Sequence, residues 1–136
     1  MLRIFLFFAI IGLVGAGIGY YLWNKPQTNM QTSRAEYTVE ATQLYSEFSS
    51  DEAAANARYL GKTIAVRGTV QSASKADDGT LKVVLSTGQD FGIVCNLDKF
   101  SDHPRTDFPP GLAIVLKGLC SGYNLDVQLD RCIEMQ

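Results

Sequence analysis

The sequence predicts a mainly β protein, in which a small five-stranded barrel follows an N-terminal transmembrane helix and one or two short helices. Three observations carry this prediction: an uncharged apolar run near the N-terminus, a helical apolar period after residue 36, and five later segments in which apolar and polar residues alternate. With 136 residues and a net charge of −2, the chain suits one small domain. This composition excludes a disordered chain, a repeat array, a strongly basic nucleic-acid binder and a large two-lobed enzyme.

The first 24 residues predict a signal anchor. Residues 4–23 carry no charge, and about 20 apolar residues suffice to cross a bilayer. Arg3 and Lys25 bracket the run, and aromatic residues suited to a membrane interface close it: Tyr20, Tyr21 and Trp23. The alternative is a secretory signal cleaved after the small residues 14–16, which would release a secreted protein.

Positive charges on the two sides of the apolar run are nearly balanced, so charge alone does not predict the side of the membrane that holds the C-terminal domain. A short N-terminal stub is expected in the cytoplasm, which places the C-terminal domain on the extracytoplasmic face (periplasmic or extracellular). Since no cysteine closely follows the apolar run, a lipid-anchored lipoprotein is not indicated.

Residues 25–36 are polar and predict a linker to a domain over residues 37–136. A first helix is predicted over residues 37–48, where the apolar residues fall on one helical face: Tyr37, Ala41, Leu44, Tyr45 and Phe48. Ser49 and Glu52 have the spacing of a capping box, which predicts a second helix over residues 51–60 that ends at Gly61.

The remaining chain alternates with period two, which predicts five strands with apolar residues facing inward. The inward sets are Ile64, Val66, Gly68 and Val70; Leu81, Val83 and Leu85; Phe91, Ile93, Cys95 and Leu97; Ile114, Leu116 and Gly118; and Leu125, Val127 and Leu129. Asp78-Gly79 predicts a hairpin turn between the first two strands, and residues 121–124 are expected to join the last two. Five strands are too few for a sandwich, and a glycine inside the long first strand suits a bent strand, so we expect a five-stranded OB-fold barrel.

Four segments together resemble the tRNA-anti-like family: ANARYLGK at residues 55–62, IAVRGTV at 64–70, GLAIVLKG at 111–118 and DVQLDRC at 126–132. The resemblance extends from residue 37 to the C-terminus. It implies an OB-fold domain, often behind an N-terminal membrane or export segment, and by analogy of fold it implies nucleic-acid binding. It brings no catalytic residues.

The residues themselves disfavour nucleic-acid binding. Acidic residues outnumber basic ones after residue 36, which weakens attraction to phosphates. OB folds that bind single strands stack bases on aromatic side chains of the second and third strands. The outward positions of those strands hold no aromatic residue: Lys82, Val84, Ser86, Gly92, Val94 and Asn96.

The three cysteines, Cys95, Cys120 and Cys132, are too far apart in sequence for a zinc site. The third and fifth strands of an OB barrel run parallel and side by side, which brings Cys95 and Cys132 together. In an oxidising compartment we expect these two to form a disulfide, with Cys120 free and largely buried. Three reduced cysteines are the alternative.

The sequence predicts no enzyme, no cofactor and no metal site, because its single histidine, His103, has no catalytic set around it. Partner contacts are expected in loops 72–80 and 98–110, and the candidate residues are Phe100, His103, Arg105, Phe108 and Tyr123. The predicted function is a membrane-tethered, extracytoplasmic binding module for a protein or small ligand of the cell envelope. The alternative is an accessory subunit of a larger membrane complex, and single-stranded nucleic-acid binding ranks third.

Overall fold

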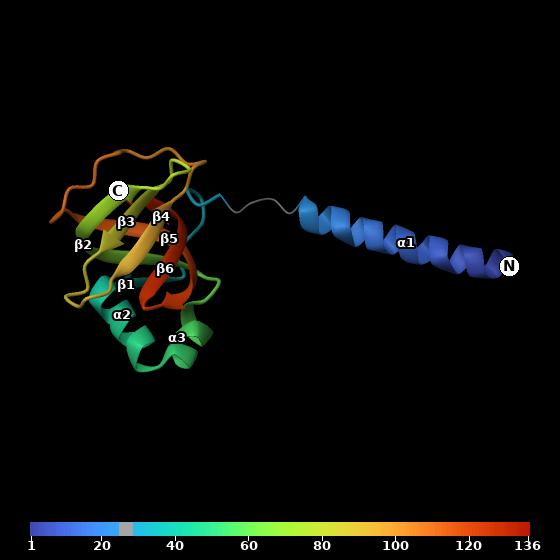
Figure 1. Ribbon diagram of the computed structural model, residues 1–136, viewed down its shortest axis with the longest axis horizontal. Coiled ribbons are helices and arrows are strands. Elements are labelled where there is room, and N and C mark those ends of the chain that lie inside the picture. Colours follow the sequence, from blue (N-terminus) through green and yellow to red (C-terminus); the bar gives the residue numbers. More distant parts are fainter. Residues whose placement is uncertain (25–28) are drawn as a thin grey trace.

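An apolar helix and a β-barrel make up the protein, as the computed structural model shows for residues 1–24 and 29–136 (Figure 1). Helix α1 covers Leu2–Trp23 and contains the segment Ile4–Trp23, which is long and apolar enough to cross a membrane. A signal sequence meets the same criteria of length and composition. The first part of the expected linker, including Lys25, lies outside the described residues.

Five strands close into the barrel, and they are β2 (Thr63–Lys75), β3 (Leu81–Leu85), β4 (Ile93–Leu97), β5 (Ala113–Asn124) and β6 (Asp126–Glu134). Their order is β2-β3-β4-β6-β5, and β5 pairs back with β2. Within the barrel β4 and β6 run parallel, and the other pairs are antiparallel. This closed arrangement confirms the predicted OB-fold barrel.

The bend of β2 allows the barrel to close. The strand pairs with β5 over residues 63–69 and with β3 from Val70 onward. At Gly68 a Cβ atom would lie 3.0 Å from the Ala41 Cβ and 3.3 Å from the Leu85 Cβ. A larger side chain would therefore push the bent strand away from its neighbours, which is the role that the sequence predicted for this glycine.

The prediction of a helix over residues 37–48 is wrong at its start. Tyr37–Glu40 forms strand β1, which pairs in parallel with the first residues of β2 outside the barrel. Helix α2 begins only at Ala41 and ends at Ser50. Pairing with β2 satisfies the backbone groups of β1, which helical periodicity alone does not take into account.

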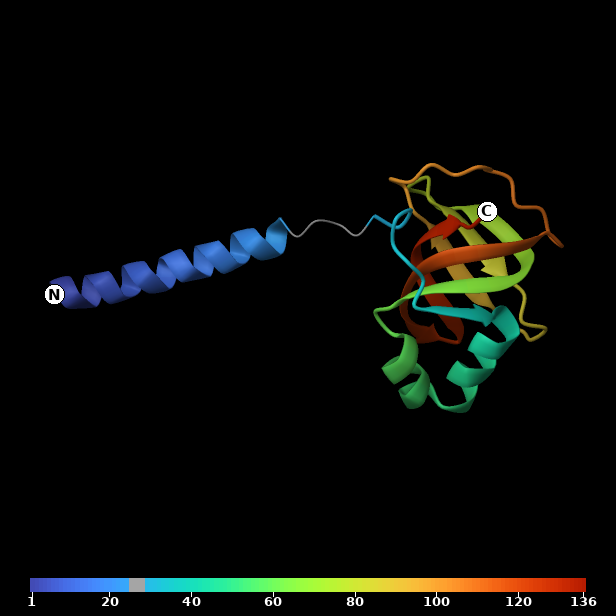
Figure 2. The ribbon, with the colours of Figure 1, turned by 180° about the vertical axis from the view of Figure 1, so that it is seen from behind.

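Helix α3 (Glu52–Tyr59) follows at once, and its N-cap differs from the predicted capping box. The Asp51 carboxylate, not Ser49, accepts a hydrogen bond from the Ala54 N–H at 3.1 Å. The helix is followed by Gly61 in the left-handed region (φ +75°), as predicted. Helices α2 and α3 cover one end of the barrel, and the β4–β5 loop (residues 98–112) crosses the opposite end (Figures 1 and 2).

Two residues expected to face inward are exposed. Phe91 precedes β4 and is 37% exposed, and Leu125 is 56% exposed with φ +65°. The strands β5 and β6 continue through the link expected at residues 121–124, so that Leu125 alone forms the turn between them. The first loop is also shorter than expected: β2 extends to Lys75, and the Asp78-Gly79 turn is confirmed within residues 76–80.

Gly118 provides the space for a buried thiol, which makes it a test of the packing. An alanine Cβ at this position would collide with the Cys132 Sγ and lie 3.1 Å from the Asp130 carbonyl oxygen. We expect Gly118→Ala to lower the free energy of unfolding by about 1–3 kcal/mol, measured by urea denaturation.

The matched control is the double variant Gly118→Ala/Cys132→Ala, which removes the colliding sulfur. The free energy of unfolding should fall less in the double variant than the sum of the decreases in the two single variants. Additive losses would show that the sulfur is not the source of the strain.

Candidate functional site

The chain that leads into the barrel is itself packed on it. In this docked segment (residues 29–36), Met30 is only 2% exposed. The buried Lys117 donates a hydrogen bond from Nζ to the Ser33 carbonyl oxygen at 2.6 Å. The Glu36 N–H donates to the Thr63 carbonyl oxygen at 2.8 Å. The second part of the expected linker is therefore fixed to the barrel.

Asp98, the residue after β4, organises the start of the β4–β5 loop. Its carboxylate is buried and accepts hydrogen bonds from the Ser101 hydroxyl at 2.6 Å and the Phe100 N–H at 3.4 Å. The Arg131 Nε lies 3.8 Å from the same carboxylate. Arg131 has φ +54° at an irregularity of β6, where its pairing with β4 shifts register, and this brings its side chain to Asp98.

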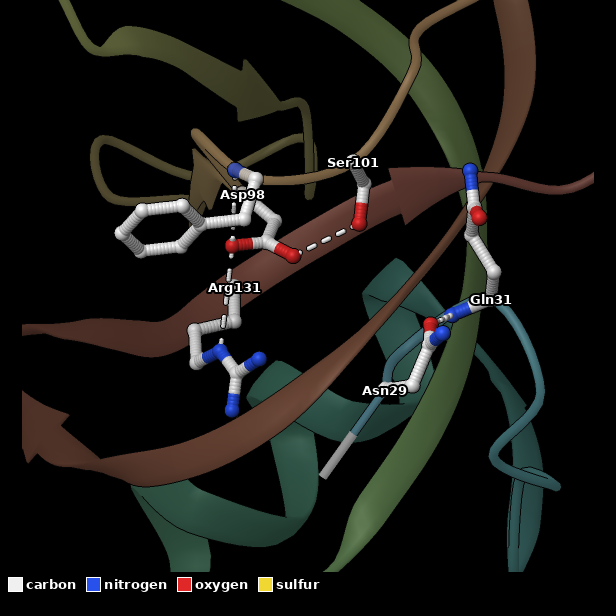
Figure 3. Close-up of a pocket in the computed structure, with 6 residues that line it drawn as sticks. Asn29, Gln31, Asp98, Ser101 and Arg131 are labelled. Carbon is white, nitrogen blue, oxygen red and sulfur yellow. Dashed lines mark hydrogen bonds and ion pairs between the residues drawn. The ribbon is translucent and has the colours of Figure 1, made fainter. Parts of the chain in front are cut away.

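The docked segment and the start of the β4–β5 loop lie next to a pocket with a cavity volume of about 410 Å³ (Figure 3). Its walls come from the docked segment, the β4–β5 loop and β6: Asn29, Gln31, Asp98, Phe100, Ser101 and Arg131. Phe100 forms an exposed rim, with 85% of its surface accessible. The pocket thus presents amide groups, a compensated pair of charges and an aromatic ring. Such a lining suits a ligand with both polar and apolar parts.

A second set of contacts ties the loop to the β2–β3 hairpin. Lys99 Nζ lies 2.5 Å from the Asp78 Oδ2, and this hydrogen bond from the ammonium holds the pKa of the Asp78 carboxyl below its usual range. The His103 Nε2 lies 2.7 Å from the Asp98 carbonyl oxygen. A smaller cavity of about 250 Å³ lies between these groups.

The structure brings together two of the five candidate contact residues. Phe100 and His103 both lie around Asp98, at the end of the barrel that the loop crosses. Arg105 is held away from the pocket by an ion pair of 3.1 Å with Glu134. The candidates therefore form no single cluster.

The remaining two candidates pack in or against the hydrophobic core. Phe108 is 3% exposed and lies in the hydrophobic core. Tyr123 packs against Phe48 and Tyr45 of α2, with ring centroids 5.6 Å and 6.2 Å apart. Phe108 thus lies in the core, and Tyr123 is partly buried and packs against it, which accounts for their aromatic character.

Several lining residues of the pocket were not predicted. Asn29 and Gln31 lie in a segment whose polar composition indicated only a linker, and Arg131 enters through the irregularity in β6. The one local signal is the spacing of Asp98 and Ser101 directly after a strand, which is typical of a side-chain-stabilised turn.

The three cysteines are free and buried, so the predicted disulfide stays a prediction. Cys95 and Cys132 lie on the parallel neighbours β4 and β6, as expected. Burial, and then a hydrogen bond with the Cys95 thiol, raise the pKa of the Cys132 thiol. Burial raises the pKa of Cys120 to about 11. Both thiols are thus protonated, weak nucleophiles at neutral pH.

On the face where OB folds bind single strands, two of the positions expected to point outward are engaged within the barrel itself. Val94 is 4% exposed and Asn96 donates to the Asp130 carboxylate at 2.8 Å. Most of the barrel's cations lie within 4 Å of a carboxylate: Arg58, Lys62, Arg67, Lys99, Arg105 and Arg131. Within residues 1–24 and 29–136, no group of three His, Cys, Asp or Glu residues could hold a metal ion.

Fold and site together define an OB-fold domain behind an apolar N-terminal helix. The chain belongs to the tRNA_anti-like family, which it matches over residues 1–133. Among solved structures it is similar to the crystal structure of a "putative nucleic acid-binding lipoprotein" from Klebsiella pneumoniae subsp. pneumoniae MGH 78578. The two chains are 20% identical with a TM-score of 0.56, and the match covers 72% of this chain and 91% of the other, which shows a common fold. No curated protein matches the chain.

The docked segment can be tested through its buried methionine. We expect Met30→Ala to lower the free energy of unfolding by about 2–5 kcal/mol, because it leaves a cavity under the segment. Met135→Ala, at a position that is 41% exposed, is the matched control and should stay within about 0.5 kcal/mol of the parent. Equal losses in urea denaturation would contradict a docked segment.

The buried carboxylate gives a second test. Asp98→Asn keeps the volume of the side chain but removes the charge that Ser101 and Arg131 face. We therefore expect the free energy of unfolding to fall by about 1.5–3 kcal/mol. The exposed Asp107, in the same loop, provides the control variant Asp107→Asn, with a change within about 0.5 kcal/mol. Chemical denaturation of both variants checks the difference, and no difference would remove Asp98 as the organiser of the loop.

Proposed function

We propose that the protein is a membrane-tethered binding module of the cell envelope. In this proposal α1 stays in the membrane, the barrel lies on the extracytoplasmic face, and the pocket between the docked segment and the β4–β5 loop captures a protein segment or a small ligand. The observation that carries the proposal is the joint construction of this pocket, to which the membrane-side chain contributes Asn29 and Gln31 and the barrel contributes the rest.

The pocket has the dimensions and the chemistry of a binding site. Its volume of about 410 Å³ falls within the range of about 300–1,000 Å³ that is typical of small-molecule sites. Asp98 contacts Ser101, the Phe100 N–H and Arg131, so the backbone at the start of the loop is held in place before a ligand arrives. Binding then needs less ordering of the loop, which favours affinity.

A binding role without catalysis suits the side chains of the pocket. The Asp98 carboxylate is engaged by Ser101, Phe100 and Arg131, and the nearby His103 contacts a backbone carbonyl. This arrangement stabilises the loop and leaves no pair of groups positioned for acid–base or nucleophilic chemistry in the described part of the pocket.

The location in the envelope rests on two supports. The segment Ile4–Trp23 has the length and apolar character of a membrane span. The similar structure from Klebsiella pneumoniae is described as a lipoprotein, which supports an envelope protein with this fold. In this chain the three cysteines are buried in the barrel, so an apolar helix and not a lipid on one of these cysteines would provide the attachment.

The name of the same neighbour and of the family would support nucleic-acid binding. We place this function behind the envelope proposal because the barrel is acidic and its cations are largely engaged with carboxylates. A fluorescent single-stranded oligonucleotide titrated at low salt distinguishes the two. The proposal expects no binding, and salt-dependent micromolar binding would reverse the order of the two functions.

The side of the membrane is tested with reporters fused to the C-terminus in a bacterial host. We expect an alkaline phosphatase fusion to be active and a green fluorescent protein fusion to be dark, because the first matures outside the cytoplasm and the second inside. Fractionation should recover the chain at full length in the membrane. The reverse reporter pattern, or a shortened soluble product, would contradict the proposal.

The pocket is tested by a photo-crosslinking residue placed in the full-length protein in cells. At Gln31, an exposed lining residue, we expect a discrete adduct, whereas the exposed Gln71 on β2 is the matched control and should give none. Identical adducts at the two positions would overturn the proposed site. A different result would favour the accessory-subunit function. In that case mild detergent extracts the protein in one stable assembly with other proteins, the contacts run through α1, and the pocket residue gives no crosslink.

A further inference from the structure

Phe100 is the most exposed large apolar side chain of the barrel unit. It is 85% exposed, compared with 56% for Leu125, 48% for Leu60 and 37% for Phe91. Single exposed apolar residues are common on soluble proteins, so exposure alone assigns no role. Its place relative to the membrane segment is what distinguishes Phe100.

Phe100 lies beside the point where the chain from α1 reaches the barrel. It lines the same pocket as Asn29, the residue at which the description of the chain resumes after α1. Figures 1 and 2 show from both sides that this chain joins the barrel next to the start of the β4–β5 loop, whereas α2 and α3 cover the far end.

The chain length limits how far this end of the barrel lies from the membrane. α1 ends at Trp23, and the residues from Trp23 to Asn29 span at most about 21 Å when fully extended. The headgroup layer of one leaflet, which the chain must cross, is roughly 5–8 Å thick and takes up that part of the span. The start of the β4–β5 loop, which shares the pocket with Asn29, therefore stays close to the bilayer whenever α1 is embedded.

The docked segment also fixes the point at which the chain from α1 is attached to the barrel. Met30 is buried, and the Ser33 carbonyl oxygen accepts the hydrogen bond from Lys117, so the chain cannot peel away from the barrel without exposing these groups. Attachment is thus at a fixed place, close to Phe100 and far from Phe91, because the two phenylalanines lie beyond opposite ends of β4.

We propose that the barrel docks on the bilayer that holds α1, with the Phe100 ring inserted at the boundary between headgroups and acyl chains. This inference rests on the proposed function, because it requires α1 to remain in the membrane. Aromatic side chains favour this boundary. A single ring binds a membrane weakly by itself, but the short tether keeps it at a high local concentration, so that a weak contact is occupied.

The charges near Phe100 indicate that the ring, not electrostatics, drives the contact. Lys99 is paired with Asp78 and Arg131 with Asp98, so the neighbouring cations are compensated. Docking should therefore depend little on the content of anionic lipid.

The test uses the full-length protein in phosphatidylcholine liposomes with and without bromine on the acyl chains. Since Trp23 is the single tryptophan, the background variant is Trp23→Phe, which keeps an aromatic residue at the helix end. Phe100→Trp is then compared with the matched control Phe91→Trp. We expect brominated lipid to lower the fluorescence of the Phe100→Trp variant by about twofold or more, with little change for the control.

Two further measurements separate the possible failures. Flotation of the liposomes reports whether α1 holds the protein in the membrane, and unfolding in urea shows that each tryptophan variant is folded. If the variants do not float, the proposed function fails and this inference fails with it. If they float but the two tryptophans are quenched equally, the docking of Phe100 alone is overturned.

Replacing a fifth or more of the lipid with phosphatidylglycerol gives the last comparison. Unchanged quenching of the Phe100→Trp variant supports insertion of the ring. Quenching that appears only with the anionic lipid would overturn the inference in favour of binding through charge.

Discussion

The double pairing of β2 is the constraint on which the rest of the structure depends. One half of this strand pairs with β5 and the other with β3, and the change of partner falls between Thr69 and Val70, where the pairing with β3 begins with an irregularity of register. A straight strand would leave the sheet open, with unpaired backbone groups along two edges. Closure also makes β4 and β6 neighbours in the barrel. The residues that follow β4 therefore lie beside the irregular part of β6.

Period-two patterning predicted the barrel well because alternation follows directly from which side chains face the core. It failed where the backbone leaves that pattern. Leu125 continues the alternation but occupies the turn between β5 and β6, and Phe91 precedes the strand to which its spacing assigned it. Tyr37–Glu40 fits a helical face in sequence, yet the free edge of β2 offers backbone hydrogen bonds that no local pattern encodes.

The pocket was less predictable than the fold because its walls come from three distant parts of the chain. The loop position of Phe100 and His103 followed from the irregular sequence after the third predicted strand. Phe108 and Tyr123 were chosen for their aromatic character, which serves the core in this fold. The contribution of Arg131 depends on a shift of register between β4 and β6, and such a shift arises only once the barrel has closed.

The burial of Lys117 against the Ser33 carbonyl has a consequence for any truncated version of the protein. Strand β5 carries an ammonium group whose hydrogen-bond acceptor belongs to the leading polar stretch and not to the barrel. A fragment that starts at Tyr37, where the first strand begins, would lack both this acceptor and the buried Met30 side chain. The smallest self-sufficient unit therefore begins several residues before the first strand, and an expression boundary drawn from secondary structure alone would cut away part of the fold.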